Sequence, residues 1–386
     1  MFDSAAAKAA GPTAARSPAE PAARPPSPLT HPWLEEPALG TVTEVAPGVF
    51  WLRMPLPFAL DHINLWLLAD GAGWTIVDCG FSTDEARAAW ENIFTQVVAP
   101  QRVSRILVTH FHPDHFGLAR WLADRWQAPV HLAAAEFAAA RGWLDGAPMH
   151  TREAHLVLFR EHGLDLGAEA HKFAKGNLYQ KGVPAIPERV EPLHDGDVIS
   201  IDGRAWRAIT GYGHSPEHVS FYCDELRVMI AGDMVLPRIS TNVSVQPRLP
   251  DADPLGGFLD SLRRYAELPA DTLVLPSHGL PFRGLHPRLA QLQSHHADRL
   301  AELVAACTEP RCAADLMKII FRRPLDTHQT FFAMGETLSH LNKLMHDGAL
   351  ARIRGEAGYQ FVVPAPAVPI TNSTHTTYAG PEEIVQ

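Results

Sequence analysis

The segment THFHPDHFG, residues 109–117, decides the fold of this chain. It follows the run RILV at 105–108, which predicts a buried strand, and it precedes a segment at 118–125 whose apolar spacing predicts a helix. A loop at the end of a strand can bring ligands together without disturbing the sheet. Because one residue separates His110 from His112, both rings can face the same point, and Asp114 and His115 then turn toward a neighbouring point.

The residue types in this segment predict a metal site. Neutral imidazole and carboxylate groups suit Zn²⁺, with Fe²⁺ and Mn²⁺ as the usual competitors. Three histidines and one aspartate at this spacing rarely arise by chance in a chain of this composition. Four side chains in one loop cannot complete two metal sites, so further ligands must come from other strand ends.

Three more candidates lie where later strands are predicted to stop. His214 follows a strand predicted at 205–209, Asp233 follows one at 228–231, and His278 follows one at 272–275, each beside a glycine. A single residue of this kind is more often structural. Three in succession behind the first loop favour a shared metal centre.

In this order, Asp78, the HxHxDH segment and the three later candidates resemble the motifs of the metallo-β-lactamase superfamily, in its glyoxalase II and lactamase-beta-2-like branch. The resemblance covers about residues 45–285. It implies an α+β fold, the αββα sandwich, with two divalent metal ions at one edge of the two sheets. The ligands that the family pattern assigns are His110, His112 and His214 for one metal, Asp114, His115 and His278 for the other, and Asp233 as the bridge. Asp78 would orient a ligating histidine, which metal sites commonly require.

The charges of such a centre predict hydrolysis. Two divalent ions contribute +4 and the ligands Asp114 and Asp233 contribute −2, which leaves a strongly electrophilic centre. A bridging water is deprotonated near neutral pH, since even one zinc lowers its pKa to about 7. The hydroxide can attack an acyl or phosphoryl centre while Asp114 orients it and relays its proton. Asp114 and Asp233 are therefore the expected catalytic residues.

Other polar residues near these motifs have less certain roles. His218 stands where many relatives have small residues, and both support of a ligand and contact with substrate remain open for it. His295 and His296 in a charged helix, and His131 on a strand, are expected to be ordinary solvated histidines. The stretch STNVS, residues 240–244, could line the pocket, although a plain loop is the default expectation.

The chain divides into four predicted parts. Residues 1–40 are rich in Ala and Pro and lack an apolar h-region, which predicts a disordered tail rather than a secretory signal and leaves an organelle-targeting segment open. Residues 41–288 form the catalytic domain, in which 133–180 are a helical insert that could cap the site. Residues 289–363 follow, and 364–386 are predicted to be a flexible tail.

The segment 289–363 predicts three helices and a terminal hairpin, a winged-helix-like module. Within it, FAMGETLSHLN at 332–342 resembles the C-terminal segment of the lactamase-beta-2-like branch, where the module lies beside the active-site cleft. DNA binding by this module is not expected, because Lys343 is the one unambiguous cation of the helix predicted at 329–346.

Composition limits the partners. The 386 residues are 46% hydrophobic and 20% charged, which is typical of a soluble globular protein, and the net charge of −10 argues against nucleic acid or an anionic membrane as a partner. The apolar runs are too short to span a bilayer. Four cysteines do not make a secreted disulfide framework in a chain of this length, which favours a cytoplasmic protein. We expect a small-molecule substrate, and the resemblance makes a homodimer an open expectation.

Three functions are compatible with the motifs. The first is hydrolysis of a small ester-like acyl substrate, a thioester or a lactone. The second is a single-stranded RNA endonuclease, which needs a basic track to the metals. The candidates for that track are Arg204, Arg207, Arg238, Arg263 and Arg264. The third is an iron-dependent oxidoreductase similar to persulfide dioxygenases. A true β-lactamase is not expected, because no signal peptide is apparent and drug-hydrolysing members use a different residue in place of Asp233.

Overall fold

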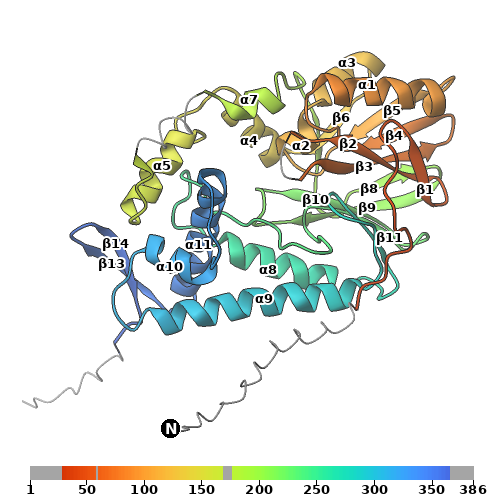
Figure 1. Cartoon of the computed structure of the whole chain (residues 1–386). Coiled ribbons are helices and arrows are strands. Elements are labelled where there is room, and N and C mark those ends of the chain that lie inside the picture. Colours follow the sequence, from red (N-terminus) through yellow and green to blue (C-terminus); the bar gives the residue numbers. More distant parts are fainter. Residues whose placement is uncertain (1–27, 58–59, 168–175, 366–386) are drawn as a thin grey trace, which may run out of the picture.

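Two β-sheets packed face to face form the centre of the structure, a computed structural model that describes residues 28–57, 60–167 and 176–365 (Figure 1). The first sheet has seven strands in chain order, antiparallel from β1 to β4 and parallel from β4 to β7. They are β1 (Val42–Ala46), β2 (Val49–Pro55), β3 (His62–Asp70), β4 (Gly73–Val77), β5 (Arg102–Leu107), β6 (Val130–Ala133) and β7 (Glu191–Leu193).

The second sheet has five strands in the order β12-β11-β10-β9-β8, with β11 and β12 parallel and the other pairs antiparallel. They are β8 (Val198–Ile201), β9 (Arg204–Gly211), β10 (His218–Cys223), β11 (Val228–Gly232) and β12 (Leu273–Pro276). A tight turn at Asp202 joins β8 to β9, and Asp202 itself has a φ of 51°.

Alternate side chains of a strand face two different cores, because the side-chain period of a strand is two. Trp51 of β2 and Trp66 of β3 are partners in the register, and their ring centroids lie 6.4 Å apart. Both belong to the core between the sheets, together with Trp206 and Phe221 of the second sheet. Leu65, the neighbour of Trp66, belongs instead to the core between the first sheet and its helices.

Helices cover the outer face of each sheet. The first sheet is covered by α1 (Asp84–Ile93), its π-helical continuation η1 (Phe94–Val98), α2 (Pro113–Phe116) and α3 (Ala119–Trp126). The second sheet is covered by α8 (Pro254–Tyr265) and α9 (Leu285–Ala306). Figure 1 shows α1 and α3 above the sheets and α8 and α9 below them. The four layers confirm the predicted αββα sandwich.

The insert and the C-terminal helical domain lie together on the left of Figure 1. The insert supplies α4 (Ala134–Leu144), α5 (Arg152–Glu161) and α7 (Leu178–Gly182). Beyond α9, the C-terminal domain contains α10 (Ala313–Ile320), α11 (Thr327–His346) and the hairpin of β13 (Ala351–Gly355) and β14 (Gly358–Val362). Phe159 of α5 shares a core with Leu316 of α10 and Leu338 of α11, so the insert packs against this domain.

One expectation about the fold needs correction, and one helix was not predicted. The disordered tail predicted for 1–40 is too long, because Thr30 pairs with Arg283, the side chain of Leu29 is buried, and Glu36 forms a 2.9 Å ion pair with Arg53. Residues 1–27 and 366–386 lie outside the described residues.

Helix α8 was not predicted, because its first turn contains the weak helix formers Gly256 and Gly257. Within the described ranges, no helix is both long and apolar enough to cross a membrane.

Candidate metal centre

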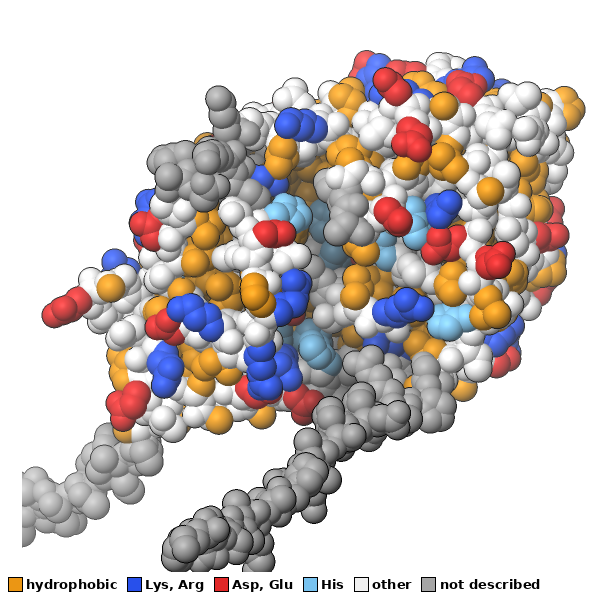
Figure 2. Space-filling view, viewed as in Figure 1, with side chains coloured by type: hydrophobic (Ala, Val, Ile, Leu, Met, Phe, Trp, Pro, Cys, Tyr) orange, Lys and Arg blue, Asp and Glu red, His pale blue; other side chains and the backbone are white. Residues whose placement is uncertain are grey.

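Four strand ends meet at one edge of the sandwich and carry the predicted ligands. Strand β5 leads into the segment 109–115, and β9, β11 and β12 lead to His214, Asp233 and His278. The structure brings the seven candidate side chains into two adjoining groups, His110, His112, His214 and Asp233 in one, and Asp114, His115 and His278 in the other. Figure 2 shows histidine side chains in and beside the hollow that divides this face of the molecule.

In the first group, three imidazole nitrogens face one another. The Nε2 of His110 lies 2.9 Å from the Nδ1 of His112, and the Nε2 of His214 lies 3.1 Å from each of these two atoms. A ring nitrogen either carries a proton or offers a lone pair, so three ring nitrogens that converge on one point cannot all form hydrogen bonds with one another. A circle through them has a radius of about 1.8 Å, shorter than the usual Zn–N distance of about 2.0–2.1 Å, so one cation can contact all three.

In the second group, the Oδ2 of Asp114 lies 3.6 Å from the Nε2 of His115 and 3.3 Å from the Nε2 of His278. Asp233 lies between the two groups. Its Oδ1 is 3.5 Å from His115 Nε2 and 3.7 Å from His278 Nε2, whereas its Oδ2 is 3.3 Å from His214 Nε2. The carboxylate therefore presents one oxygen to each group.

Two of these atoms lack a partner of their own. The Nε2 of His115 and the Oδ1 of Asp233 are buried, and neither has a hydrogen-bond partner among the described residues. Leaving buried polar atoms unpaired costs free energy, so native proteins rarely do it. A cation between the ligand atoms would satisfy both, and the donor set of imidazole and carboxylate fits such a cation.

The electrostatics differ between the two groups of ligands. Burial favours neutral His110 and His112, whereas the carboxylates near His115 and His278 outweigh burial and raise the pKa of these two rings. Burial lowers the pKa of His112 to about 3, and the nearby His214 adds to that shift. Burial also places the pKa of His110 well below its usual value. Burial raises the pKa of Asp114, but the charge of His115 opposes it and brings the value to about 2. Neutral imidazole and ionised carboxylate are the protonation states that bind metal.

Asp78 holds the His115 ring from behind. Its backbone has a φ of 64°, a left-handed conformation that Asp tolerates better than most residues. The carboxylate accepts a 2.8 Å hydrogen bond from His115 Nδ1 and another of 2.8 Å from the backbone N–H of Thr109. The bond to Nδ1 leaves the Nε2 of His115 facing the cluster.

His218 lies behind the cluster rather than in the hollow. Its side chain is fully buried, and its Nε2 accepts a 3.2 Å hydrogen bond from the backbone N–H of Asp233. The ring centroid lies 4.9 Å from that of His110. Of the two roles left open for His218, this position favours support of a ligand over contact with substrate.

Several residues that hold the site were not identified from the sequence. Asn64 of β3 donates to the carbonyls of Pro276 and Gly279, which flank His278, at 2.9 and 2.6 Å. The sequence feature that could have identified Asn64 is a single polar residue within the apolar run 63–68. The stretch 240–244 is more than a plain loop, because the carbonyl of Asn242 accepts a 2.8 Å hydrogen bond from His214 Nδ1.

The insert contributes a further residue of this kind. Glu136, in the first turn of α4, is fully buried and accepts hydrogen bonds from Phe111, Ser215 and Glu217. These donors lie in the two loops that carry His112 and His214. A glutamate in an Ala-rich helix gives no signal of such a role.

The histidines outside the cluster differ in how deeply their side chains are buried. His295 is exposed, as expected, but the prediction of a solvated His296 is wrong. That side chain is fully buried, and its Nδ1 lies 3.1 Å from the Nε2 of His340 on α11. His131 on β6 is partly exposed. A pair of buried histidines therefore joins α9 to the C-terminal domain.

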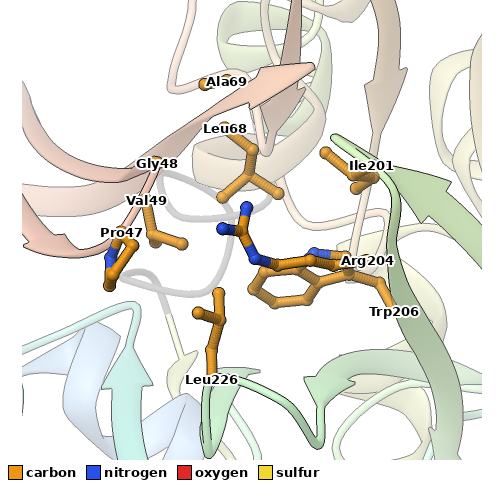
Figure 3. A pocket seen from close by; sticks show the side chains of 9 residues that line it. All are labelled: Pro47, Gly48, Val49, Leu68, Ala69, Ile201, Arg204, Trp206 and Leu226. Atoms are coloured by element: carbon orange, nitrogen blue, oxygen red, sulfur yellow. The ribbon is translucent and has the colours of Figure 1, made fainter. Parts of the chain in front are cut away.

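A small pocket lies between the two sheets, away from the candidate ligands (Figure 3). Val49 and Leu68 of the first sheet and Trp206 of the second are among its lining residues. Its volume of about 10 Å³ has room for about one water molecule. Arg204 also lines it and is paired with Glu225 at 3.1 Å. The pocket is too small to hold a substrate.

Comparison with known proteins agrees with this geometry. The model of the metallo-beta-lactamase superfamily matches residues 59–278, and that of the metallo-beta-lactamase-like C-terminal domain matches residues 300–363. The probable metallo-hydrolase YqjP of Bacillus subtilis is 24% identical, over 78% of this chain and 93% of that protein. The atrochrysone carboxyl ACP thioesterase of Aspergillus fumigatus is 25% identical, over 72% of this chain and 75% of that protein.

A solved structure extends the likeness over most of the chain. The beta-lactamase domain protein from Burkholderia ambifaria is 47% identical and superposes with a TM-score of 0.82, covering 87% of this chain and 98% of that one. The matched regions include both the sandwich and the C-terminal helical domain. The chain is a member of the metallo-beta-lactamase superfamily, related to metal-dependent hydrolases.

Proposed function

We propose that this chain is a hydrolase that uses two divalent metal ions, with zinc as the first choice, on small ester-like acyl substrates, thioesters or lactones. The observation that carries the proposal is the position of Asp233, whose two carboxylate oxygens face separate groups of ligand atoms. A carboxylate in this position can bridge two cations at the separation of dinuclear hydrolases, about 3.5–4 Å.

The ligand charges support the same chemistry. When bound, the two ions would supply a hydroxide at neutral pH and stabilise negative charge on the substrate oxygen. Five neutral histidines and two aspartates would leave a net charge of about +2 in a largely buried site. The side chain of Asp114 is 20% exposed, so its carboxylate is accessible to an incoming water. Asp114 can therefore accept the proton of the attacking water and pass it on.

The open side of the cluster defines how substrate approaches. His112, Asp114 and His214 are partly exposed, whereas the other four candidate ligands are buried. A substrate carbonyl therefore meets the cluster between the 110–115 loop and the 214–217 loop. The insert and the C-terminal domain lie on the same side of the sandwich (Figure 1). These two elements are expected to select the acyl group.

Two observations favour an acyl substrate over RNA. The Aspergillus relative bears the name of a thioesterase. Of the cations suggested for a basic track, three are already paired with carboxylates: Arg204 with Asp202 and Glu225, Arg263 with Asp260, and Arg264 with Asp195. Paired arginines contribute little to a phosphate track. The two ligand groups also suit two ions better than the single iron expected of a persulfide dioxygenase.

The proposal can be tested on the purified chain. Elemental analysis should find two metal ions per chain, and an acyl thioester or a lactone should be hydrolysed faster than a phosphodiester. Activity should disappear with a chelator and return with Zn²⁺. His295→Gln, which changes an exposed histidine outside the cluster, is the matched control and should keep full activity. Preference for single-stranded RNA, with strong inhibition by salt, would refute the acyl assignment.

A further inference from the structure

Glu136 connects two loops that are far apart in the sequence. Its Oε2 accepts a 2.9 Å hydrogen bond from the backbone N–H of Phe111, the residue between His110 and His112. Its Oε1 accepts 2.7 Å and 2.6 Å hydrogen bonds from the Ser215 hydroxyl and the Glu217 backbone N–H. Ser215 directly follows His214. One carboxylate therefore holds both sides of the first ligand group.

The contact is reciprocal. The carboxylate of Glu217 accepts a 3.2 Å hydrogen bond from the backbone N–H of Ala135, in the first turn of α4. The other polar group of Phe111 is also held by the insert, because its carbonyl accepts a 2.8 Å hydrogen bond from the Tyr179 hydroxyl. The peptide groups between His110 and His112 are thereby fixed from two directions.

Burial of the Glu136 carboxylate has a free-energy cost, which its three hydrogen bonds offset. Burying a carboxylate is unfavourable, and burial raises the pKa of Glu136 even though its three hydrogen bonds oppose the shift. An apolar residue at this position would avoid that penalty, but it would leave the backbone N–H groups of Phe111 and Glu217 without their acceptor. A buried ionised group retained at such a contact is well suited to fixing geometry, because charge-assisted hydrogen bonds are short and directional.

We infer that Glu136 is a positioning residue, which sets the separation of His112 and His214 and thereby the affinity of the first metal position. The inference rests on the two metal positions of the proposed function. The three ring nitrogens converge to within about 3 Å of one another, so a small shift of either loop would open the triangle. The insert thus contributes to metal binding although it supplies no ligand.

The test measures metal affinity rather than turnover. Glu136→Gln keeps the size of the side chain but replaces one acceptor oxygen with an amide donor, so it disrupts at least one of the three hydrogen bonds. In a His278→Ala background, which removes a ligand of the second group, Zn²⁺ affinity is determined by competition with a chromogenic chelator. We expect the Glu136→Gln change to weaken binding about 10- to 100-fold, the usual effect of losing a residue that orients ligands.

Matched variants separate positioning from general stability. Ser215→Ala removes one donor and keeps both backbone bonds, so its affinity should fall less, by about 2- to 10-fold. Asn64→Ser removes a buried amide that holds the His278 loop, and in the same background it should change first-position affinity by less than about threefold. Thermal unfolding of each metal-free protein is recorded beside these values.

The outcomes distinguish the inference from the proposed function. If Glu136→Gln lowers only the midpoint of metal-free unfolding and leaves Zn²⁺ affinity unchanged, Glu136 is merely structural and the inference is wrong. The inference also fails if Asn64→Ser weakens the first position as much as Glu136→Gln does. If the unmodified chain binds a single ion, the dinuclear function is refuted, while the affinity comparison at the first position still decides the role of Glu136.

Discussion

The buried histidine pair, His296 of α9 and His340 of α11, should make the protein lose stability in mild acid. Both side chains are fully buried. The Nδ1 of His340 donates a 2.8 Å hydrogen bond to the carbonyl of Glu336, so its Nε2 can accept a 3.1 Å hydrogen bond from His296 Nδ1. Adding a proton to either ring would place charge in the core, and a proton on His340 Nε2 would also face the N–H of His296 Nδ1.

The size of the effect follows from the pKa values. Burial lowers the pKa of His296 to about 3 and that of His340 to about 4, and His295 lowers both further. An unfolded chain binds these protons near pH 6.5. The pair's contribution is therefore complete above about pH 6.5 and is lost as the pH falls toward about 4. Between pH 7.5 and 5.0 each histidine accounts for about 2 kcal/mol, and the pair for about 4 kcal/mol.

The assay is urea unfolding at pH 7.5 and 5.0 in the presence of a chelator, so that metal binding does not contribute. The unmodified chain is compared with the double variant His296→Leu and His340→Met, which replaces the pair with apolar groups of similar size. The double variant should lose about 4 kcal/mol less free energy of unfolding than the unmodified chain over this pH range. His295→Gln removes the neighbouring charge that lowers both pKa values, so this variant should lose slightly less stability in acid than the unmodified chain, and the difference should be much smaller than for the double variant.

Equal pH dependence in the double variant and the unmodified chain would refute this reasoning, because every other titrating group is common to both. A fall in the free energy of unfolding by the same amount at both pH values would also refute it. That result would mean that the pair contributes by packing and not through its protonation.

Three other predictions concern the site. Asp233→Ala should abolish turnover while circular dichroism of the metal-free protein stays unchanged, and retained turnover would contradict the bridge. Removal of metal should lower the midpoint of thermal unfolding, since an ion at 100 times its Kd adds about 2.7 kcal/mol per site; an unchanged midpoint would argue against bound metal. Gly232→Ala should cost about 2 kcal/mol or more in urea unfolding, because Gly232 has a φ of 54° and an added Cβ would clash with His218. Gly71→Ala, at a φ of 60° with open space around it, is the control and should cost less.

Sequence alone was enough for the features that are local along the chain. The strand-loop-helix pattern around residues 109–117 reflects backbone geometry over a few residues. Ligand types and their order then pointed to the superfamily. Local signals failed where they conflicted, as in α8. Its two glycines disfavour a helix, although Asp253 caps the N-terminus by accepting a hydrogen bond from the Gly256 N–H.

The contacts that hold the site depended on tertiary structure. Glu136 and Ser215 are 79 residues apart, and Asn64 lies 212 residues from Pro276. The burial of His296 depends on α11, which lies 44 residues further along the chain at His340. A side chain's sequence neighbours set its backbone conformation, but its burial and hydrogen-bond partners come from segments that only the folded chain brings together. The residue types that could bind metal were therefore fixed by the sequence, and the positions that they take around it by the packing of the sheets, the insert and the C-terminal domain.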